Sequence, residues 1–98
     1  MDLYDLIIYK LDISVKDDKT KIVILFEHDK EKAEAVFFNA TKINIDMFSL
    51  PNKASFININ DNAGKGYQSD VRYYVEEYEN ESLSFYCEEY KIDYGRKI

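Results

Sequence analysis

Apolar and polar residues alternate along the first part of the chain, and a run of five apolar residues follows a polar break. Apolar side chains occupy every second position from Ile7 to Val15, which is the period of a strand with one buried face. Residues 22–26 are all apolar, which is typical of a strand covered on both faces. Residues 16–20 between them are polar and have turn composition. The pattern predicts a β-hairpin, and the predicted core residues are Ile7, Tyr9, Leu11, Ile13, Val23, Leu25 and Phe37.

Two later segments fit a strand and a helix about equally well. In residues 29–40, Asp29 could cap a helix, whereas Val36, Phe37 and Phe38 favour a strand. Apolar residues in 69–92 fit both periods. The nine tyrosines favour strands. We therefore predict a single domain, residues 1–98, that is mainly β, with an antiparallel sheet or meander of about five to six strands. The alternative is an α+β fold with one or two helices in residues 29–40 or 69–92.

The charge balance and the first residues of the sequence argue against several classes of protein. Nineteen acidic residues against 13 basic ones give a net charge of −6, so direct binding of nucleic acid is not expected, because the phosphate backbone demands Lys and Arg. No apolar run reaches the ~20 residues of a membrane helix. The first five residues carry acids where an export signal would carry bases, and a single cysteine fits a reducing compartment. We expect a cytoplasmic protein.

The acidic residues concentrate near the end of the chain. Residues 70–94 hold eight acids and two bases, with six tyrosines between them. In an extended segment, Glu77, Glu79 and Glu81 would follow one another about 6.7 Å apart. DNA carries one charge per ~3.4 Å along each strand, so such a row can imitate part of a phosphate track, and tyrosines add contact area. The alternative is a solvated acidic hairpin that only favours solubility. The predicted partner-binding residues are Tyr74, Glu76, Glu77, Tyr78, Glu79, Glu81, Glu88, Glu89 and Asp93.

A hairpin of residues 72–79 and 82–89 would arrange these side chains. With the turn centred on residues 80–81, Arg72 lies opposite Glu89, and Glu77 lies opposite Ser84. Arg72 would then hold the sheet together locally. The carboxylates expected to stay unpaired, and so open to a basic partner, are those of Glu76, Glu77, Glu79, Glu81 and Glu88.

No motif indicates a reaction or a cofactor. Residues 58–69 lack the central glycine and the final glutamate of an EF-hand loop. Residues 60–66 lack the first glycine and the Ser or Thr of a phosphate-binding loop. His28 and Cys87, the single histidine and the single cysteine, have no zinc-type spacing around them. We expect neither catalysis nor a cofactor, and a metal site with His28 and Cys87 as ligands is the alternative interpretation.

The composition also carries a resemblance to a class of proteins. Residues with A/T-rich codons, such as Ile, Lys, Asn and Tyr, are abundant, which is typical of a low-GC bacterium or its phage. A small acidic, tyrosine-rich chain of this kind, with its acidic segment 70–93, resembles the phage-encoded anti-CRISPR proteins of low-GC bacteria. The resemblance implies an inhibitor in the bacterial host cell that binds the basic channel of an RNA-guided nuclease and blocks nucleic-acid loading. The other hypotheses are an immunity or antitoxin protein that neutralises a nuclease toxin, and a small assembly module.

Overall fold

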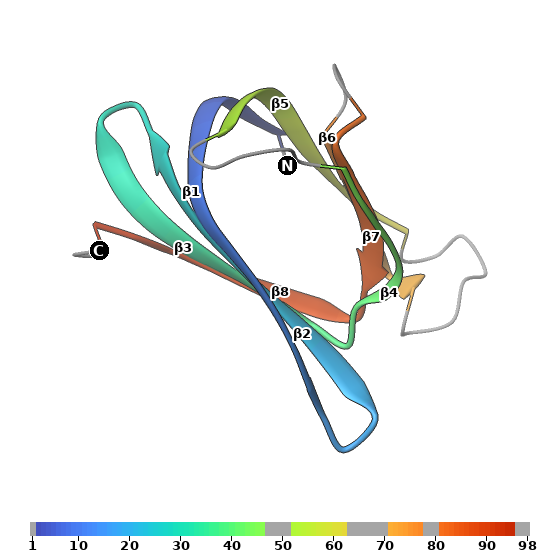
Figure 1. Cartoon of the computed structure of the whole chain (residues 1–98). Helices are drawn as coiled ribbons and strands as arrows, with labels where there is room; N and C mark the ends of the chain where they lie inside the picture. Colours follow the sequence, from blue (N-terminus) through green and yellow to red (C-terminus); the bar gives the residue numbers. More distant parts are fainter. Residues whose placement is uncertain (1, 47–51, 63–70, 78–80, 96–98) are drawn as a thin grey trace.

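Figure 1 shows a computed structural model of the chain, which describes residues 2–46, 52–62, 71–77 and 81–95. Eight antiparallel strands form one sheet in the order β4-β7-β6-β5-β1-β2-β3-β8. The described residues contain no α-helix. The predicted mainly β fold is confirmed, with eight strands rather than five or six. The strands are β1 (Asp2–Lys16), β2 (Lys19–His28), β3 (Glu31–Phe38), β4 (Thr41–Ile45), β5 (Asn52–Asp61), β6 (Tyr73–Glu77), β7 (Leu83–Cys87) and β8 (Glu89–Tyr94).

The helical alternative is wrong for the described parts of both ambiguous segments. Residues 31–38 form β3, and residues 73–77, 83–87 and 89–94 form β6, β7 and β8. Aromatic and β-branched side chains pack well on a pleated surface. They pack here as cross-strand neighbours, such as Phe37 on Tyr90, which lies opposite it, with ring centroids 6.2 Å apart.

The sheet closes on itself because β4 continues β3 and β8 continues β7. β3 pairs with β8 from Ala33 opposite Tyr94 to Phe38 opposite Glu89. β4 carries the same register onward, with Thr41 opposite Tyr86. Between these ladders the Glu88 amide donates a hydrogen bond of 3.0 Å to the Phe38 carbonyl. The strands therefore surround one core, which fills the space inside the ring of ribbon in Figure 1.

Two tight turns set the register of the first three strands. Asp17 and Asp18 connect β1 to β2 with φ of 53° and 61°, and Asp29 and Lys30 connect β2 to β3 with φ of 52° and 65°. Positive φ at both central residues is the signature of a type I′ turn, whose twist matches that of the flanking strands. The predicted hairpin of the first two segments is confirmed.

The predicted core is correct only in part. Phe37 is buried and Leu11 packs against the core, but Tyr9 and Ile13 are 38% and 49% exposed. Ile7, Val23 and Leu25 are half-buried. The core consists of Leu3, Leu6, Ile8, Ile22, Ile24, Phe26, Ala33, Ala35, Phe37, Ala40, Ile57, Ile59, Val75, Leu83, Phe85 and Cys87.

A β-bulge at Tyr9 explains the error in β1. Ile8 pairs with Phe26 and Lys10 pairs with the adjacent Leu25, so Tyr9 is an extra residue on β1. An extra residue shifts the alternation by one position. Leu6 and Ile8 face the core before the bulge, and Leu11 faces it afterwards. The predicted series from Ile7 to Val15 assumed one unbroken alternation, although the bulge interrupts it. In residues 22–26 every side chain is apolar, so the sequence does not show which face is buried.

Beyond the bulge, the β1–β2 hairpin extends past the closed sheet. Among the residues that the structure describes, β5 pairs with β1 only as far as Ile8, and β3 pairs with β2 only as far as Ile22. β1 and β2 continue together to Lys16 and Lys19. Residues 10–21, called the arm below, therefore project from the ring, as the blue hairpin of Figure 1 shows.

Candidate partner-binding site

The predicted acidic surface is not one surface in the structure. Tyr74, Glu76, Glu77 and Glu81 line a pocket of about 210 Å³. Glu88 and Glu89 line a separate groove, and Asp93 lies on β8. Tyr78 and Glu79 lie outside the described residues. The first pocket, called the carboxylate pocket below, is lined by Asn44, Tyr74, Glu76, Glu77, Glu81, Leu83 and Ser84.

The pairing of β6 with β7 decides which side chains reach the carboxylate pocket. Glu76 lies opposite Ser84, and Tyr74 lies opposite Tyr86. The expected pairing of Glu77 with Ser84 is therefore wrong by one residue. A slip of one residue moves every side chain of a strand to the other face.

Glu77 is consequently part of the interior rather than of an exposed carboxylate row. Its residue is 1% exposed, and its Oε1 accepts a hydrogen bond of 2.8 Å from Ser82 Oγ. Ser82 is itself buried. The expectation that Glu77 stays unpaired and open to a partner is wrong, because a buried carboxylate must keep hydrogen-bond donors around it.

Two tyrosines lie beside the pocket. The rings of Tyr74 and Tyr86 have centroids 4.7 Å apart and are tilted by 37°. Burial raises the pKa of Tyr74, and the negative charge of Glu76 raises it further. The ammonium of Lys42 lies 5.4 Å from the centroid of the Tyr86 ring, which is a cation–π distance.

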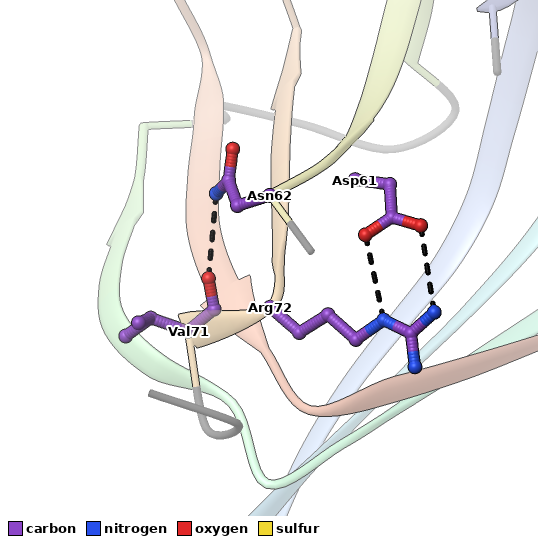
Figure 2. Close-up of polar contacts among 4 residues, drawn as sticks. All are labelled: Asp61, Asn62, Val71 and Arg72. Atoms are coloured by element: carbon purple, nitrogen blue, oxygen red, sulfur yellow. Dashed lines mark hydrogen bonds and ion pairs between the residues drawn. The ribbon is translucent and has the colours of Figure 1, made fainter. Parts of the chain in front are cut away.

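Arg72 fixes the entry into β6. Figure 2 shows its guanidinium against Asp61 of β5, with Nε 3.4 Å from Oδ1 and Nη2 3.5 Å from Oδ2. Asn62 Nδ2 donates to the Val71 carbonyl at 3.3 Å in the same view. The bond to Asp61 raises the pKa of Arg72. The predicted cross-strand pair with Glu89 is wrong, and Arg72 instead ties β6 to β5.

The groove that holds Glu88 and Glu89 has mixed charge. It encloses about 530 Å³ between the arm and the junction of β7 with β8. Asn39 Nδ2 donates to Glu88 Oε2 at 3.0 Å, so the expectation that Glu88 is unpaired is wrong. Because three lysines share this groove, it does not extend the negative surface of the carboxylate pocket. Its lining residues are Ser14, Lys16, Lys19, Thr20, Lys21, Phe38, Asn39, Glu88 and Glu89.

Asp93, the last predicted residue, is also engaged. Its Oδ2 lies 3.7 Å from Lys91 Nζ, and Asp93 lies opposite Glu34 across the β3–β8 ladder. The lining residues of the carboxylate pocket that sequence reasoning missed are Asn44, Leu83 and Ser84. Ser84 follows from the correct register, whereas no local signal in β4 points to Asn44.

His28 and Cys87 occupy unrelated environments. Cys87 is fully buried in β7, and burial raises the pKa of its thiol to about 12. His28 Nδ1 lies 2.6 Å from the Tyr4 carbonyl, and because a carbonyl only accepts, this nitrogen carries the proton. In the part of the chain that the structure describes, no group of three or more His, Cys, Asp or Glu could hold a metal ion.

Comparisons with protein-family models, with curated proteins and with solved structures gave no match. Over the described ranges, no helix is long and apolar enough to cross a membrane.

Proposed function

We propose that this chain is a non-enzymatic binding protein that accepts a cationic side chain of a basic partner protein in the carboxylate pocket. The observation that supports the proposal is the character of the lining. Every charged side chain among the described lining residues is a carboxylate, namely Glu76, Glu77 and Glu81. The volume of about 210 Å³ is below the roughly 300–1,000 Å³ of small-molecule sites, so it fits one side chain better than a metabolite.

Arginine is the side chain that matches this lining best. A guanidinium is planar, donates to carboxylates in a fork and stacks on aromatic rings. Glu76 and Glu81 supply acceptors, and Tyr74 supplies a ring. Lys42 already lies over the neighbouring Tyr86 at cation–π distance. Lysine lacks the planar fork and is expected to bind more weakly.

Glu77 supports the pocket from behind, because its side chain is buried and lies on the opposite face of β6 from Tyr74 and Glu76. Its carboxylate is held by Ser82 at 2.8 Å, so it does not need to reorganise when a cation arrives. A fixed carboxylate close behind a pocket is screened less by water than the same group on an open surface, so it adds to the attraction for a cation.

The partner class follows from the preference for arginine. Arginine-rich surfaces are typical of proteins that bind nucleic acid. Occupation of such a surface excludes its nucleic acid, so binding would inhibit a nuclease without catalysis. In this proposal the chain acts as an inhibitor of the anti-CRISPR type, and an immunity protein against a nuclease toxin would use the same contacts.

The test compares two variants of equal charge. One variant carries Glu76→Gln and Glu81→Gln in the pocket, and the other carries Asp17→Asn and Asp18→Asn at the tip of the arm. A fluorescent arginine-rich peptide is titrated with each at about 150 mM salt. We expect at least about a tenfold loss of affinity, or about 1.4 kcal/mol, for the pocket variant, and a change below about twofold for the arm variant.

Two outcomes would count against the proposal. Equal losses in both variants would mean that only net charge attracts the peptide. Unchanged affinity of the pocket variant would remove Glu76 and Glu81 from the binding surface. A lysine-rich peptide of the same length serves as the control for the arginine preference.

A further inference from the structure

The arm carries a strand edge that the described strands leave uncovered. β1 pairs with β2 from Leu6 to Lys16, but its other neighbour, β5, ends its pairing at Ile8. In the described residues nothing pairs with the outer edge of residues 10–16. Ile13 and Val15 of this strand are 49% and 69% exposed. A strand edge with apolar side chains is a template for another strand.

The turn fixes which backbone groups this edge presents. In a two-residue hairpin the residues that flank the turn form a hydrogen-bonded pair. From there, non-hydrogen-bonded and hydrogen-bonded pairs alternate along the ladder. The flanking residues are Lys16 and Lys19. Counted back from this pair, the amides and carbonyls of Leu11, Ile13 and Val15 point away from β2.

We propose that a second copy of this chain pairs antiparallel with this edge, about a two-fold axis at Ser14. In this register Ile13 lies opposite Val15 of the other copy, so the outward-pointing groups of both strands meet in hydrogen-bonded pairs. Lys16 lies opposite Asp12 of the other copy. The two-fold axis forms each of these pairs twice.

Charge and backbone geometry together select this register. Centring on Ile13 would place Lys10 opposite Lys16, and centring on Val15 would leave only residues 14–16 opposite strand residues, because Asp17 and Asp18 form the turn. Like charges directly opposite each other destabilise a sheet. A register that pairs Ile13 with Ser14 would place a residue whose backbone groups point away from β2 opposite one whose backbone groups point toward β2.

The charged groups of the arm are available for such contacts. Lys10 Nζ and Asp12 Oδ2 lie 3.4 Å apart, with both side chains 59% exposed, and exposed pairs of this kind are weak. Lys16 lies opposite Lys19 across the hairpin, and a carboxylate from a second copy would relieve this repulsion. Because the arm projects from the ring (Figure 1), two copies can join arms while their closed sheets stay apart.

The experiment measures self-association of the full chain by sedimentation equilibrium. Asp12→Lys places lysine opposite lysine, and Lys16→Asp places aspartate opposite aspartate. We expect each variant alone to dimerise at least tenfold more weakly than the natural chain. An equimolar mixture of the two should form a heterodimer, and the double variant Asp12→Lys/Lys16→Asp should recover the homodimer, because both arrangements restore opposite charges.

A backbone variant tests the edge without changing its charge. Val15→Pro removes an outward-pointing amide and leaves the ladder with β2 intact, as prolines on edge strands do. We expect loss of the dimer with an unchanged circular dichroism spectrum. A natural chain that is monomeric at about 100 µM, a dimer that survives Val15→Pro, or a mixture that fails to form the heterodimer would each overturn the proposal. The carboxylate pocket is not used, so the peptide titration above remains an independent result.

Discussion

Deletion of Tyr9 should leave the fold intact, although Tyr9 lies in the middle of the longest strand. Tyr9 is the extra residue of the bulge between Ile8 and Lys10. Without it, Ile8 faces the core, Lys10 faces outward and Leu11 faces the core, so the alternation becomes regular and no core residue moves to the surface. The deletion removes the hydrogen bond of 2.7 Å from Tyr9 Oη to Glu27 Oε2 and the contact of its ring with Lys32, both of which are exposed.

Deletion of Ile7 is the matched control, and it should be far more costly. Without Ile7, the part of β1 before the bulge is one residue short. The extra residue of the bulge can fill this gap only if Tyr9 takes the position of Ile8. Ile8 is 0% exposed, so a tyrosine in its place overpacks the core, while Ile8 itself takes the half-buried position of Ile7. Overpacking of this kind typically costs about 1–3 kcal/mol, occasionally more, and we expect the Ile7 deletion to be about 3 kcal/mol less stable than the Tyr9 deletion.

Urea unfolding followed by circular dichroism measures both free energies of unfolding. Deletion of Lys10 is a second control, because it also regularises the ladder and keeps the contacts of Tyr9. It should be at least as stable as the Tyr9 deletion. If the Tyr9 deletion unfolds the chain, or costs as much as the Ile7 deletion, the assignment of the extra residue is wrong.

Three further predictions concern single side chains. Since burial raises the pKa of Cys87 from the usual 9.0 to about 12, its thiolate at pH 8 is about a thousandfold rarer than that of an ordinary thiol, and a disulfide reagent should modify it only after urea is added. For the same reason an unfolded chain releases this proton first, so stability should fall as the pH rises above about 9 in urea titrations. Ser82→Ala should lower the free energy of unfolding by about 1.5–3 kcal/mol, because it removes a donor from the buried Glu77 carboxylate. Ser84→Ala, two residues further on in β7, should change it by less than about 0.5 kcal/mol. Lys30→Gly should raise the unfolding free energy by about 0.5–1 kcal/mol, because Lys30 has φ of 65° and glycine adopts this conformation without strain; no gain, or a gain of the same size from Lys21→Gly within β2, would contradict this reasoning.

The sequence was sufficient to predict strands but not their faces. Tyrosines and β-branched residues identified the fold class, and the polar break at residues 16–20 located the first turn. The buried face was ambiguous because Ile7 and Ile8, and all of residues 22–26, are apolar on both sides. A bulge changes the face through one residue, and nothing in the composition around Tyr9 marks it.

For the candidate site, the sequence likewise predicted the residues better than the faces on which they lie. Tyr74, Glu76, Glu77 and Glu81 were all selected, and they do lie around one pocket. The role of Glu77 was wrong because the hairpin register was displaced by one residue. Asn44 was missed because β4 reaches the pocket through its pairing with β7, a contact between distant parts of the chain that local patterns do not contain.

The closure of the sheet also has a consequence during synthesis. The ladder that joins β3 to β8 is completed by Tyr94, so a chain still on the ribosome holds β1, β2 and β3 as a ready meander whose last edge has no neighbour. Pairs between such distant residues carry the largest loop-closure cost and form late in folding. The nascent chain is therefore most exposed to aggregation or chaperone binding at the edge of β3 until β8 has emerged.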